Sequence, residues 1–383
     1  MARAAHEALG ERIGEALVVA PAYDEGRGLP VSWRLVRGGH PKPDEGSLEA
    51  AAEALSLAAS LTADDLLLVL LSGGGSSLMA APAEGLSLEE KSRAISLLMA
   101  AGAPIAEINA VRGALSRVKA GWLSAACGPA EVVTLVLSDL GDDGWHLVAS
   151  GPTLGIPPSP ASALAILDRY RVSPLLPPAA RAVLMRPPPA SAPLKTGPRW
   201  SVLLADIRTA LEGARAAALR LGIDARPVPE LLTGEARSAA RRLSVAGVSA
   251  GHFFRHHAAR PHVTLFGGET TVTVTGPGHG GRNRELALAT AMQIAGAPGA
   301  CALVAGTDGV DFEPDAAGAF VDGTTIDRAE ALGLDPWSAL RDNDTGPFFA
   351  ALGDAFTPGP TGTNVGDVAF VLAPGDVTSG EAD

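Results

Sequence analysis

Short runs of β-branched residues and leucine alternate with longer, alanine-rich amphipathic stretches along most of the chain. Short apolar runs are typical of buried strands, whereas apolar positions that recur every three or four residues are typical of helices. Strands alternating with helices predict an α/β fold with mostly parallel, Rossmann-like sheets. We expect strands at Ala16–Val19, Leu66–Leu71, Val132–Leu137, Ser201–Ala205, Val263–Phe266, Val272–Thr275, Ala302–Ala305 and Val368–Leu372. We expect helices at Ser47–Ser60, Ser87–Ala101, Ile105–Ala126, Pro160–Tyr170, Ile207–Leu221, Gly234–Ala246, Arg282–Ala295 and Thr324–Leu332.

A proline-rich segment from Arg186 to Pro198 interrupts this alternation. Proline fixes φ and cannot donate a backbone hydrogen bond, so the segment favours a semi-rigid connector. The chain has 383 residues, which is long for one domain and comfortable for two. We therefore expect an N-terminal α/β domain over residues 1–190 and a C-terminal α/β domain over residues 199–375.

The charge balance excludes some classes of partner. Acidic residues number 42 against 30 basic ones, for a formal net charge of −12. This balance argues against general nucleic-acid binding, which needs a basic footprint. No segment reaches the roughly 20 apolar residues of a membrane span, and the N-terminus has no apolar signal-peptide core. We expect a cytoplasmic protein with neither nucleic-acid nor membrane partners.

The strand expected at Leu66–Leu71 runs directly into a turn rich in glycine and serine. Glycine lets backbone N–H groups approach an anion closely, and serine hydroxyls add donors. A turn after a parallel strand lies at the carboxyl edge of the sheet, where α/β proteins bind ligands. A tightly packed connector is the alternative to an anion-binding loop. The candidate nucleotide-phosphate contacts are Ser72, Gly73, Gly74, Gly75, Ser76 and Ser77.

A second glycine-rich turn precedes the helix expected at Arg282–Ala295. Backbone donors at a helix N-terminus favour negative charge, and arginine can hold a phosphate through paired N–H groups. We interpret Arg282 as a catalytic residue and Gly280, Gly281 and Asn283 as phosphate contacts. The alternative is a solvated arginine in a flexible loop.

Two other strands end in acidic turns. Asp139 and Asp142 follow one strand, and Asp308 and Asp311 follow another. Aspartates at such places are typical Mg²⁺ ligands or general bases, although Asp-Gly pairs are also ordinary turn formers. We take Asp139 and Asp308 as catalytic candidates and Asp142 and Asp311 as metal candidates, while the division between base and metal ligand stays open.

A basic stripe is expected on the helix at Ile105–Ala126. Arg112, Ser116 and Lys119 are spaced by four and three residues, which places them near one helix face. Such a stripe is either a solvated surface or a source of positive charge for a phosphate site. Glu269 lies in a tight turn expected between two strands, beside the second glycine-rich turn. The candidate substrate contacts are Asn109, Arg112, Lys119 and Glu269.

Taken together, these motifs resemble the type II glycerate kinases, whose C-terminal half is called the MOFRL domain. The order and spacing of the matching segments extend from about residue 16 to residue 372. In the first half they are Gly39–Asp44, Leu71–Ser77, Ile108–Arg112, Leu115–Gly121 and Ala149–Thr153; in the second half they are Gly267–Val274, Gly280–Asn283, Gly306–Asp311, Asp315–Ala319 and Thr361–Val365.

The resemblance implies two α/β domains with the active site in the cleft between them. It implies transfer of the γ-phosphoryl group of ATP, with Mg²⁺, to a hydroxyl of D-glycerate, usually the 2-hydroxyl. Phosphoryl transfer needs in-line positioning and neutralisation of charge more than covalent help from the protein. We therefore expect Arg282→Ala to abolish most activity with little loss of stability. D-glycerate is the expected partner, and a homodimer is the candidate assembly.

Members of this family usually begin with several tens of residues that would precede Met1. That leading segment holds a strand and a G-x-G-K-A turn whose lysine is thought to be catalytic. We expect the reading frame to continue upstream of Met1 and to encode this turn. Two alternatives to the kinase stay open. One is a hydroxypyruvate reductase, a name sometimes attached to this family. The other is a non-catalytic protein that binds a nucleotide or sugar acid, for which the missing lysine is the reason.

Overall fold

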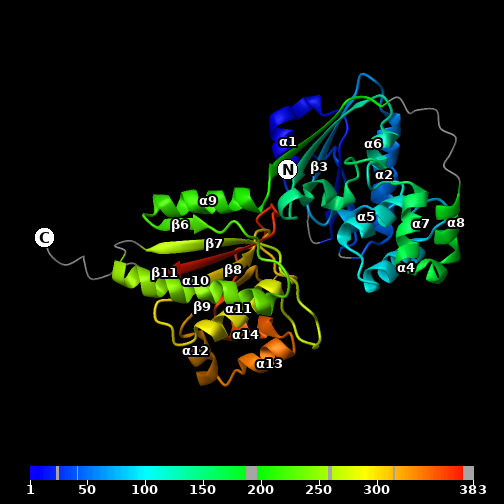
Figure 1. The fold of residues 1–383 in the computed structure, drawn as a ribbon. Coiled ribbons are helices and arrows are strands. Elements are labelled where there is room, and N and C mark those ends of the chain that lie inside the picture. Colours follow the sequence, from blue (N-terminus) through cyan, green and yellow to red (C-terminus); the bar gives the residue numbers. More distant parts are fainter. Residues whose placement is uncertain (23–25, 41, 187–195, 258–260, 314, 374–383) are drawn as a thin grey trace. The chain divides into compact units, whose positions relative to one another are not determined.

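In the computed structural model the described residues are 1–22, 26–40, 42–186, 196–257, 261–313 and 315–373, excluding the side chains of residues 142–143 and 248–257. The chain forms two compact units (Figure 1). The first unit comprises Met1–Leu137 and Asp143–Leu204, and the second comprises Ser138–Asp142 and Ala205–Asp383. Each unit is described by itself below.

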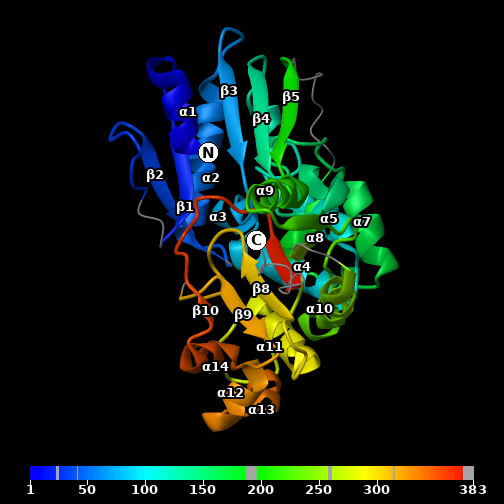
Figure 2. The same cartoon turned by 90° about the vertical axis from the view of Figure 1, so that its left-hand side faces the viewer.

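The first unit contains two separate sheets. Strands β3 (Leu66–Leu71), β4 (Glu131–Leu137) and β5 (Arg199–Ala205) form a three-stranded sheet in that order and lie side by side in Figure 2. Strands β1 (Leu17–Pro21) and β2 (Arg34–Gly38) form a parallel pair, and β3 and β4 are also parallel. Helices α4, α5, α7 and α8 pack around a core that includes Leu98, Val111, Leu167 and Leu184. The helices of this unit are α1 (Ala2–Leu9), α2 (Glu45–Ser60), α3 (Gly75–Leu78), α4 (Leu88–Ala100), α5 (Ile105–Ala114), α6 (Trp122–Ala126), α7 (Pro160–Arg169) and α8 (Pro178–Met185).

The second unit is built on one six-stranded sheet in the order β10-β9-β8-β11-β7-β6. Its strands are β6 (Asp224–Pro227), β7 (His262–Gly268), β8 (Cys301–Gly306), β9 (Gly318–Asp322), β10 (Ala355–Phe356) and β11 (Asp367–Ala373). Only β6 and β7 pair in parallel; the other pairings of this sheet are antiparallel. Its helices are α9 (Ile207–Arg220), α10 (Ala236–His257), α11 (Arg282–Ile294), α12 (Thr325–Ala331), α13 (Pro336–Arg341) and α14 (Thr345–Leu352).

Both faces of this sheet are covered by helices, as Figure 1 shows with α9 on one side and α10 and α11 on the other. Successive side chains of a strand point to opposite faces of the sheet, and β11 has side chains packed on both faces. Ala369 and Val371 belong to the core beneath α10 and α11, whereas Val368, Phe370 and Leu372 pack with α9. A strand buried on both faces reads as a continuous apolar run, which explains why the sequence pattern marks it so clearly.

The α/β class predicted from the sequence is confirmed, and several details differ. The second sheet is mostly antiparallel, because β11 returns between β7 and β8 in the opposite direction. Val272–Thr275 forms no strand; only Thr271 makes an isolated bridge, to Glu235. Strand β5 joins the first unit's sheet, so the first unit extends to Leu204, beyond the boundary expected at residues 190–199. Residues 187–195 of the expected linker lie outside the described part.

The helix expected at Ile105–Ala126 is two helices. Helix α5 ends at Ala114 and α6 begins at Trp122. Between them Ala120 and Gly121 adopt left-handed φ angles of 53° and 85°. Their N–H groups donate to the carbonyls of Ser150 and Gly151, each at 2.8 Å. These tertiary hydrogen bonds replace the helical ones, so Arg112, Ser116 and Lys119 do not share one helix face.

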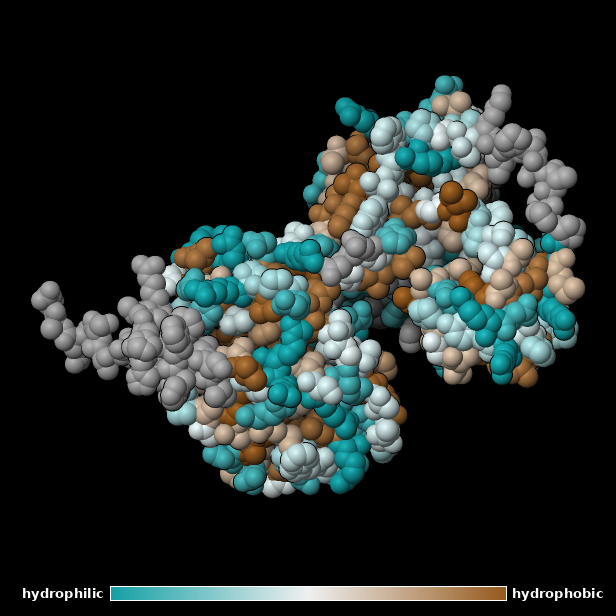
Figure 3. Space-filling view, in the orientation of Figure 1, coloured by the Kyte–Doolittle hydropathy of each residue, from teal (hydrophilic) through white to brown (hydrophobic). Residues whose placement is uncertain are grey.

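The described surface mixes hydrophobic and hydrophilic side chains over both units, as Figure 3 shows for one face. Trp200, Val202 and Leu204 on β5 are all about half exposed. No helix among the described residues is long and apolar enough to span a membrane. The homodimer and the cytoplasmic location stay predictions.

Candidate active site

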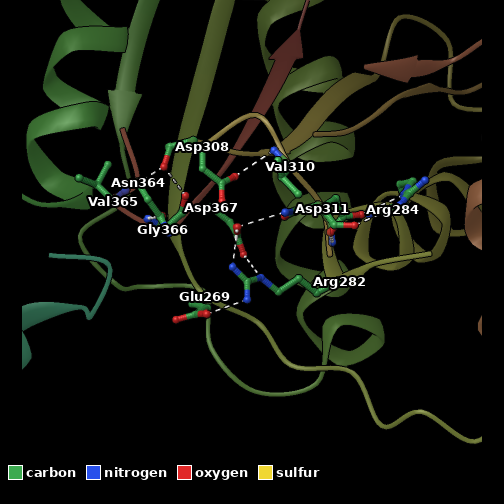
Figure 4. A network of polar contacts seen from close by, with 12 residues as sticks. Glu269, Arg282, Arg284, Asp308, Val310, Asp311, Asn364, Val365, Gly366 and Asp367 are labelled. Atoms are coloured by element: carbon green, nitrogen blue, oxygen red, sulfur yellow. Dashed lines mark hydrogen bonds and ion pairs between the residues drawn. The ribbon is translucent and has the colours of Figure 1, made fainter. Parts of the chain in front are cut away.

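The topology of the second unit brings charged residues from distant segments to one edge of its sheet. Strand β11 is antiparallel to β7 and to β8, so Asp367 at its start lies opposite Gly268 and Gly306, the last residues of those strands. Glu269 follows β7, Asp308 lies two residues beyond β8, and α11 begins nearby with Arg282. Figure 4 shows these side chains converging.

Arg282 is held by two carboxylates. Its Nε and Nη2 donate to Asp367 at 2.6 and 3.1 Å, and its Nη1 donates to Glu269 at 2.7 Å (Figure 4). Asn283 adds a hydrogen bond from its Nδ2 to Asp367 at 3.1 Å. Burial by itself would lower the pKa of Arg282, but the negative charge of Asp367 and then of Glu269 outweighs burial and raises it. Arg282 is therefore a fixed cation whose position is set by its acidic partners.

Asp367 is the main residue that the sequence reasoning missed. Its side chain is 8% exposed, yet it stands at the head of an apolar strand. A buried carboxylate needs a cationic or hydrogen-bonding partner. The signal available in the sequence was an acidic residue at the first position of the apolar run Asp367–Ala373.

Two carboxylic acids near Arg282 have raised pKa values. Burial raises the pKa of Glu269 despite the nearby charge of Arg282, and the charges of Asp367 and Asp139 raise it further. Burial also raises the pKa of Asp308, although the N–H of Val310 donates to its carboxylate at 3.0 Å. A carboxylate whose pKa lies above its ordinary value is a better proton acceptor than a solvated one.

Asp139 belongs to the second unit and lines a small pocket there. The pocket has a volume of about 270 Å³. Its lining residues are Asp139, Leu140, Gly141, Ile207, Leu231, Thr233, Gly268 and Glu269. Two predicted site residues, Asp139 and Glu269, thus face one cavity beside Arg282.

Asp311 has a structural role at the start of α11, and metal ligation by this residue stays a prediction. Its side chain is fully buried, and it accepts hydrogen bonds from the backbone N–H groups of Asn283 and Arg284 at the start of α11, both at 2.9 Å. The Nε of Arg284 donates to the same carboxylate at 3.1 Å. Both oxygens of Asp311 are therefore committed to the helix start and to a buried ion pair.

The side chain of Asp142, the other metal candidate, lies outside the described residues. Among the side chains that the structure describes, no group of three or more His, Cys, Asp or Glu residues is arranged to hold a metal ion. Mg²⁺ commonly takes only one or two protein carboxylates together with phosphate oxygens. The carboxylates of Asp139 and Glu269, which line one pocket and repel each other, fit that kind of site.

The second glycine-rich turn owes its glycines to close packing. A Cβ on Gly276 would lie 2.3 Å from the carbonyl of Asp342, and one on Gly280 would lie 2.4 Å from Oγ1 of Thr345. A Cβ on Gly281 would lie 2.3 Å from Cγ of Asp311. The turn therefore packs closely against the backbone and side chains of neighbouring segments, which supplies a reason for its glycines other than phosphate binding. Phosphate contacts from Gly280 and Gly281 stay predictions.

We expect Gly281→Ala to lower the free energy of unfolding by roughly 1–3 kcal/mol, because overpacking at this contact displaces Asp311 from the start of α11. Urea denaturation measures the change. Gly213→Ala is the matched control: nothing lies within 4 Å of its added Cβ. Since Gly213 lies inside α9, this control is expected to stabilise the protein by about 0.5–1 kcal/mol. Equal effects of the two substitutions would contradict the packing role.

The first unit gathers a different set of polar groups around the first glycine-rich turn. Gly74 has a left-handed φ of 81°, and α3 follows it. The hydroxyl of Ser76 lies 2.8 Å from that of Ser150. Nζ of Lys119 donates to the carbonyl of Ser76 and, at 2.7 Å, to its hydroxyl. The turn and Lys119 are thus neighbours, although they lie more than 40 residues apart in sequence.

Arg112 reaches the same place from α5. Its Nη1 donates to Asn109 at 2.5 Å and to the hydroxyl of Ser150 at 3.4 Å. The structure therefore brings together Asn109, Arg112 and Lys119, the three substrate contacts expected in this half. Neither Arg112 nor Lys119 forms an ion pair with a carboxylate in the described part of the first unit. Burial, followed by the charges of Lys91 and Arg112, lowers the pKa of Lys119 well below its ordinary value.

In one α/β unit the buried Lys119 and the partly buried Arg112 lie beside hydroxyl groups. In the other unit an arginine lies among carboxylates, two of which have raised pKa values. Such groups are typical of enzymes that act on small anionic molecules. Residues 1–185 match the family model described as a domain of unknown function, DUF4147. Residues 262–367 match the MOFRL family.

Comparison with individual proteins is more specific. The chain is 38% identical to the D-glycerate 2-kinase of Thermotoga maritima, over 97% of this chain and 87% of that protein. A crystal structure of glycerate kinase from Thermotoga maritima matches with a TM-score of 0.84 and 37% identity, covering 97% of this chain and 88% of that one. A putative hydroxypyruvate reductase of Agrobacterium vitis is 40% identical over 88% of this chain and 77% of its own length. The chain belongs to the glycerate kinase family, and the resemblance noted from its sequence motifs is confirmed.

Proposed function

We propose that this protein is a D-glycerate 2-kinase, which transfers the γ-phosphoryl group of ATP to the 2-hydroxyl of D-glycerate and releases 2-phosphoglycerate and ADP. The observation that carries the proposal is its 38% identity with the Thermotoga maritima D-glycerate 2-kinase over nearly the whole chain. The anion-suited groups of the first unit and the acidic groups of the second unit support the proposal. The ligand cleft between the two halves stays a prediction.

The site residues described above have separate roles in the proposed reaction. Arg112, Lys119 and the hydroxyl of Ser76 hold an anionic group of a substrate through charge-assisted hydrogen bonds. Asp308 accepts the proton of the attacking hydroxyl, because burial raises its pKa. Arg282 stabilises the negative charge of the transferred phosphoryl group in the transition state. Mg²⁺ bound with ATP would neutralise phosphate charge, and Asp139 and Glu269 are the residues that would hold it.

A direct assay tests the proposal. The full chain is mixed with ATP, Mg²⁺ and D-glycerate, ADP release is followed by a coupled reaction, and ³¹P NMR distinguishes 2-phosphoglycerate from 3-phosphoglycerate. We expect release of ADP that depends on D-glycerate and a single 2-phosphoglycerate signal. ADP release that is independent of D-glycerate, or a 3-phosphoglycerate product, would contradict the assignment.

Hydroxypyruvate reduction is the second candidate, because one relative carries that name. The turn Gly276–Gly281 does read G-x-G-x-x-G. A dinucleotide fingerprint needs this motif directly after a strand, but residues 272–275 form no strand and the glycines pack against neighbouring backbone. An absorbance assay with hydroxypyruvate and NADH or NADPH separates the two activities, and we expect no oxidation of either cofactor.

A further inference from the structure

Lys91 is a buried cation to which neither the sequence motifs nor the proposed reaction assigns a part. It lies on α4 and is 5% exposed. Its Nζ has no hydrogen-bond partner among the described residues, and no described carboxylate forms an ion pair with it. An unpaired ammonium group is costly to bury, so it marks a place where an additional partner would be favourable.

The charged groups that act on Lys91 are also cationic. Arg112 extends from α5, and Lys119 lies in the segment after that helix. Burial, and then the charge of Arg112, lowers the pKa of Lys91 to about 7. The charges of Lys91 and Arg112 in turn act on Lys119. The buried Lys91 and Lys119 and the partly buried Arg112 thus share one region. None of them forms an ion pair with a carboxylate among the described side chains of the first unit.

Hydroxyl donors are built into the same region. Ser76 and Ser150 are within 2.8 Å of each other, and Lys119 and Arg112 each donate to one of them. Ala149 and Ser150 have left-handed φ angles of 54° and 60°, which are unfavourable for residues with a side chain. Such backbone is retained when the surrounding structure imposes it, and it often occurs at ligand sites. Here it directs the Ser150 hydroxyl toward Ser76 and Arg112.

We propose that Lys91, Lys119 and Arg112 form a buried binding site for one small oxyanion, a carboxylate or phosphate group, with the hydroxyls of Ser76 and Ser150 as additional ligands. Lys91 is the counterion that becomes fully protonated when the anion binds, since a nearby negative charge favours the ammonium form. The inference rests on the proposed function only for the identity of the anion, which would be the carboxylate of D-glycerate or a phosphate group of the nucleotide or product.

Isothermal titration calorimetry of the full chain tests the site without turnover. D-glycerate, 2-phosphoglycerate and inorganic phosphate are titrated separately at about pH 8, in two buffers with different enthalpies of ionisation. We expect the wild type to take up protons on binding, because Lys91 is mostly neutral at that pH before the anion binds and burial lowers the pKa of Lys119 as well. Binding of D-glycerate but not inorganic phosphate would identify a carboxylate site, and the reverse would identify a phosphate site.

Three variants separate anion binding from a packing role of Lys91. Lys91→Met should weaken binding of the recognised anion roughly 10- to 100-fold and reduce the proton uptake, leaving only the part that belongs to Lys119. Lys91→Arg should retain much of the affinity with a similarly reduced proton uptake, because arginine is always charged. Arg93→Met removes a positive charge from an exposed position of the same helix, and it should leave both quantities unchanged.

Stability gives a second, independent readout. Because the folded state lowers the pKa of Lys91 from 10.5 to about 7, the unfolded chain binds more protons between these values, so stability rises with pH across that window. Lys91→Met should raise the melting temperature at pH 7 and flatten this rise.

Absence of proton uptake in the wild type, or wild-type binding by Lys91→Met, would overturn the proposed site. If the protein binds the anion with proton uptake but has no kinase activity, the proposed anion site is supported. The proposed function is then contradicted.

Discussion

Replacing Arg282 by alanine is expected to lower kcat for phosphoryl transfer by about 10³-fold or more, the range typical of arginines that stabilise the transferred phosphoryl group. The guanidinium is held at Nε and Nη2 by Asp367 and at Nη1 by Glu269, so its charge is positioned before any substrate binds. Steady-state kinetics with saturating ATP and D-glycerate measure the effect. Arg282→Lys retains the charge but not the paired donors, and it should recover only a small part of the rate.

The same substitution is also expected to destabilise the protein, which differs from the small stability effect anticipated from the sequence. Asp367 is buried and would keep only the hydrogen bond from Asn283. A buried carboxylate left without its cation costs several kcal/mol, and partial exposure of Arg282 reduces this to about 2–3 kcal/mol. Chemical denaturation of the Arg282→Ala, Asp367→Asn double variant provides the control, because neutralising Asp367 should recover stability without recovering activity. Wild-type turnover by Arg282→Ala would refute the catalytic role.

Replacing Arg284 by methionine is expected to produce the largest loss of stability, about 3–5 kcal/mol, because it leaves a buried charge without its partner. The Arg284 side chain is 1% exposed and that of Asp311 is fully buried. Arg284 also donates to Asp315 at 2.9 Å and to the carbonyl of Asp311 at 3.1 Å. Its removal therefore affects both the core and the loop that follows β8. Urea denaturation monitored by circular dichroism measures the change.

Two further variants identify the cause of that loss. In Arg284→Met combined with Asp311→Asn the buried charge is gone, so part of the lost stability should return. The return is partial because the amide oxygen can accept from only one of the two N–H groups at the start of α11, while the amide NH2 faces the other. Arg341→Met removes an exposed arginine and should leave stability within experimental error. A loss in Arg284→Met no larger than in Arg341→Met would show that the buried pair contributes nothing to stability.

The sequence determined the elements whose signal is local. Apolar runs in the sequence located β3, β4, β7, β8 and β11, because the run of apolar residues is itself the signal for each of these strands. The glycine and serine turn after β3 was recognisable for the same reason, because its six residues are all glycine or serine, which favour a tight turn. Hydrophobic periodicity does not indicate which enzyme the turns belong to. The resemblance to the family motifs supplied that information.

The tertiary structure decided the features that depend on contacts distant in sequence. The direction of β11 places Asp367 beside Arg282, 85 residues away, and no local pattern specifies that pairing. Hydrogen bonds from Ala120 and Gly121 to the segment at Ser150 end the expected long helix, and this break allows Lys119 to reach Ser76. The glycines before α11 that suggested a phosphate loop also permit close packing against neighbouring segments. Helical periodicity and glycine content report what a segment can adopt, whereas burial and long-range hydrogen bonds select which of those conformations lowers the free energy of the whole fold.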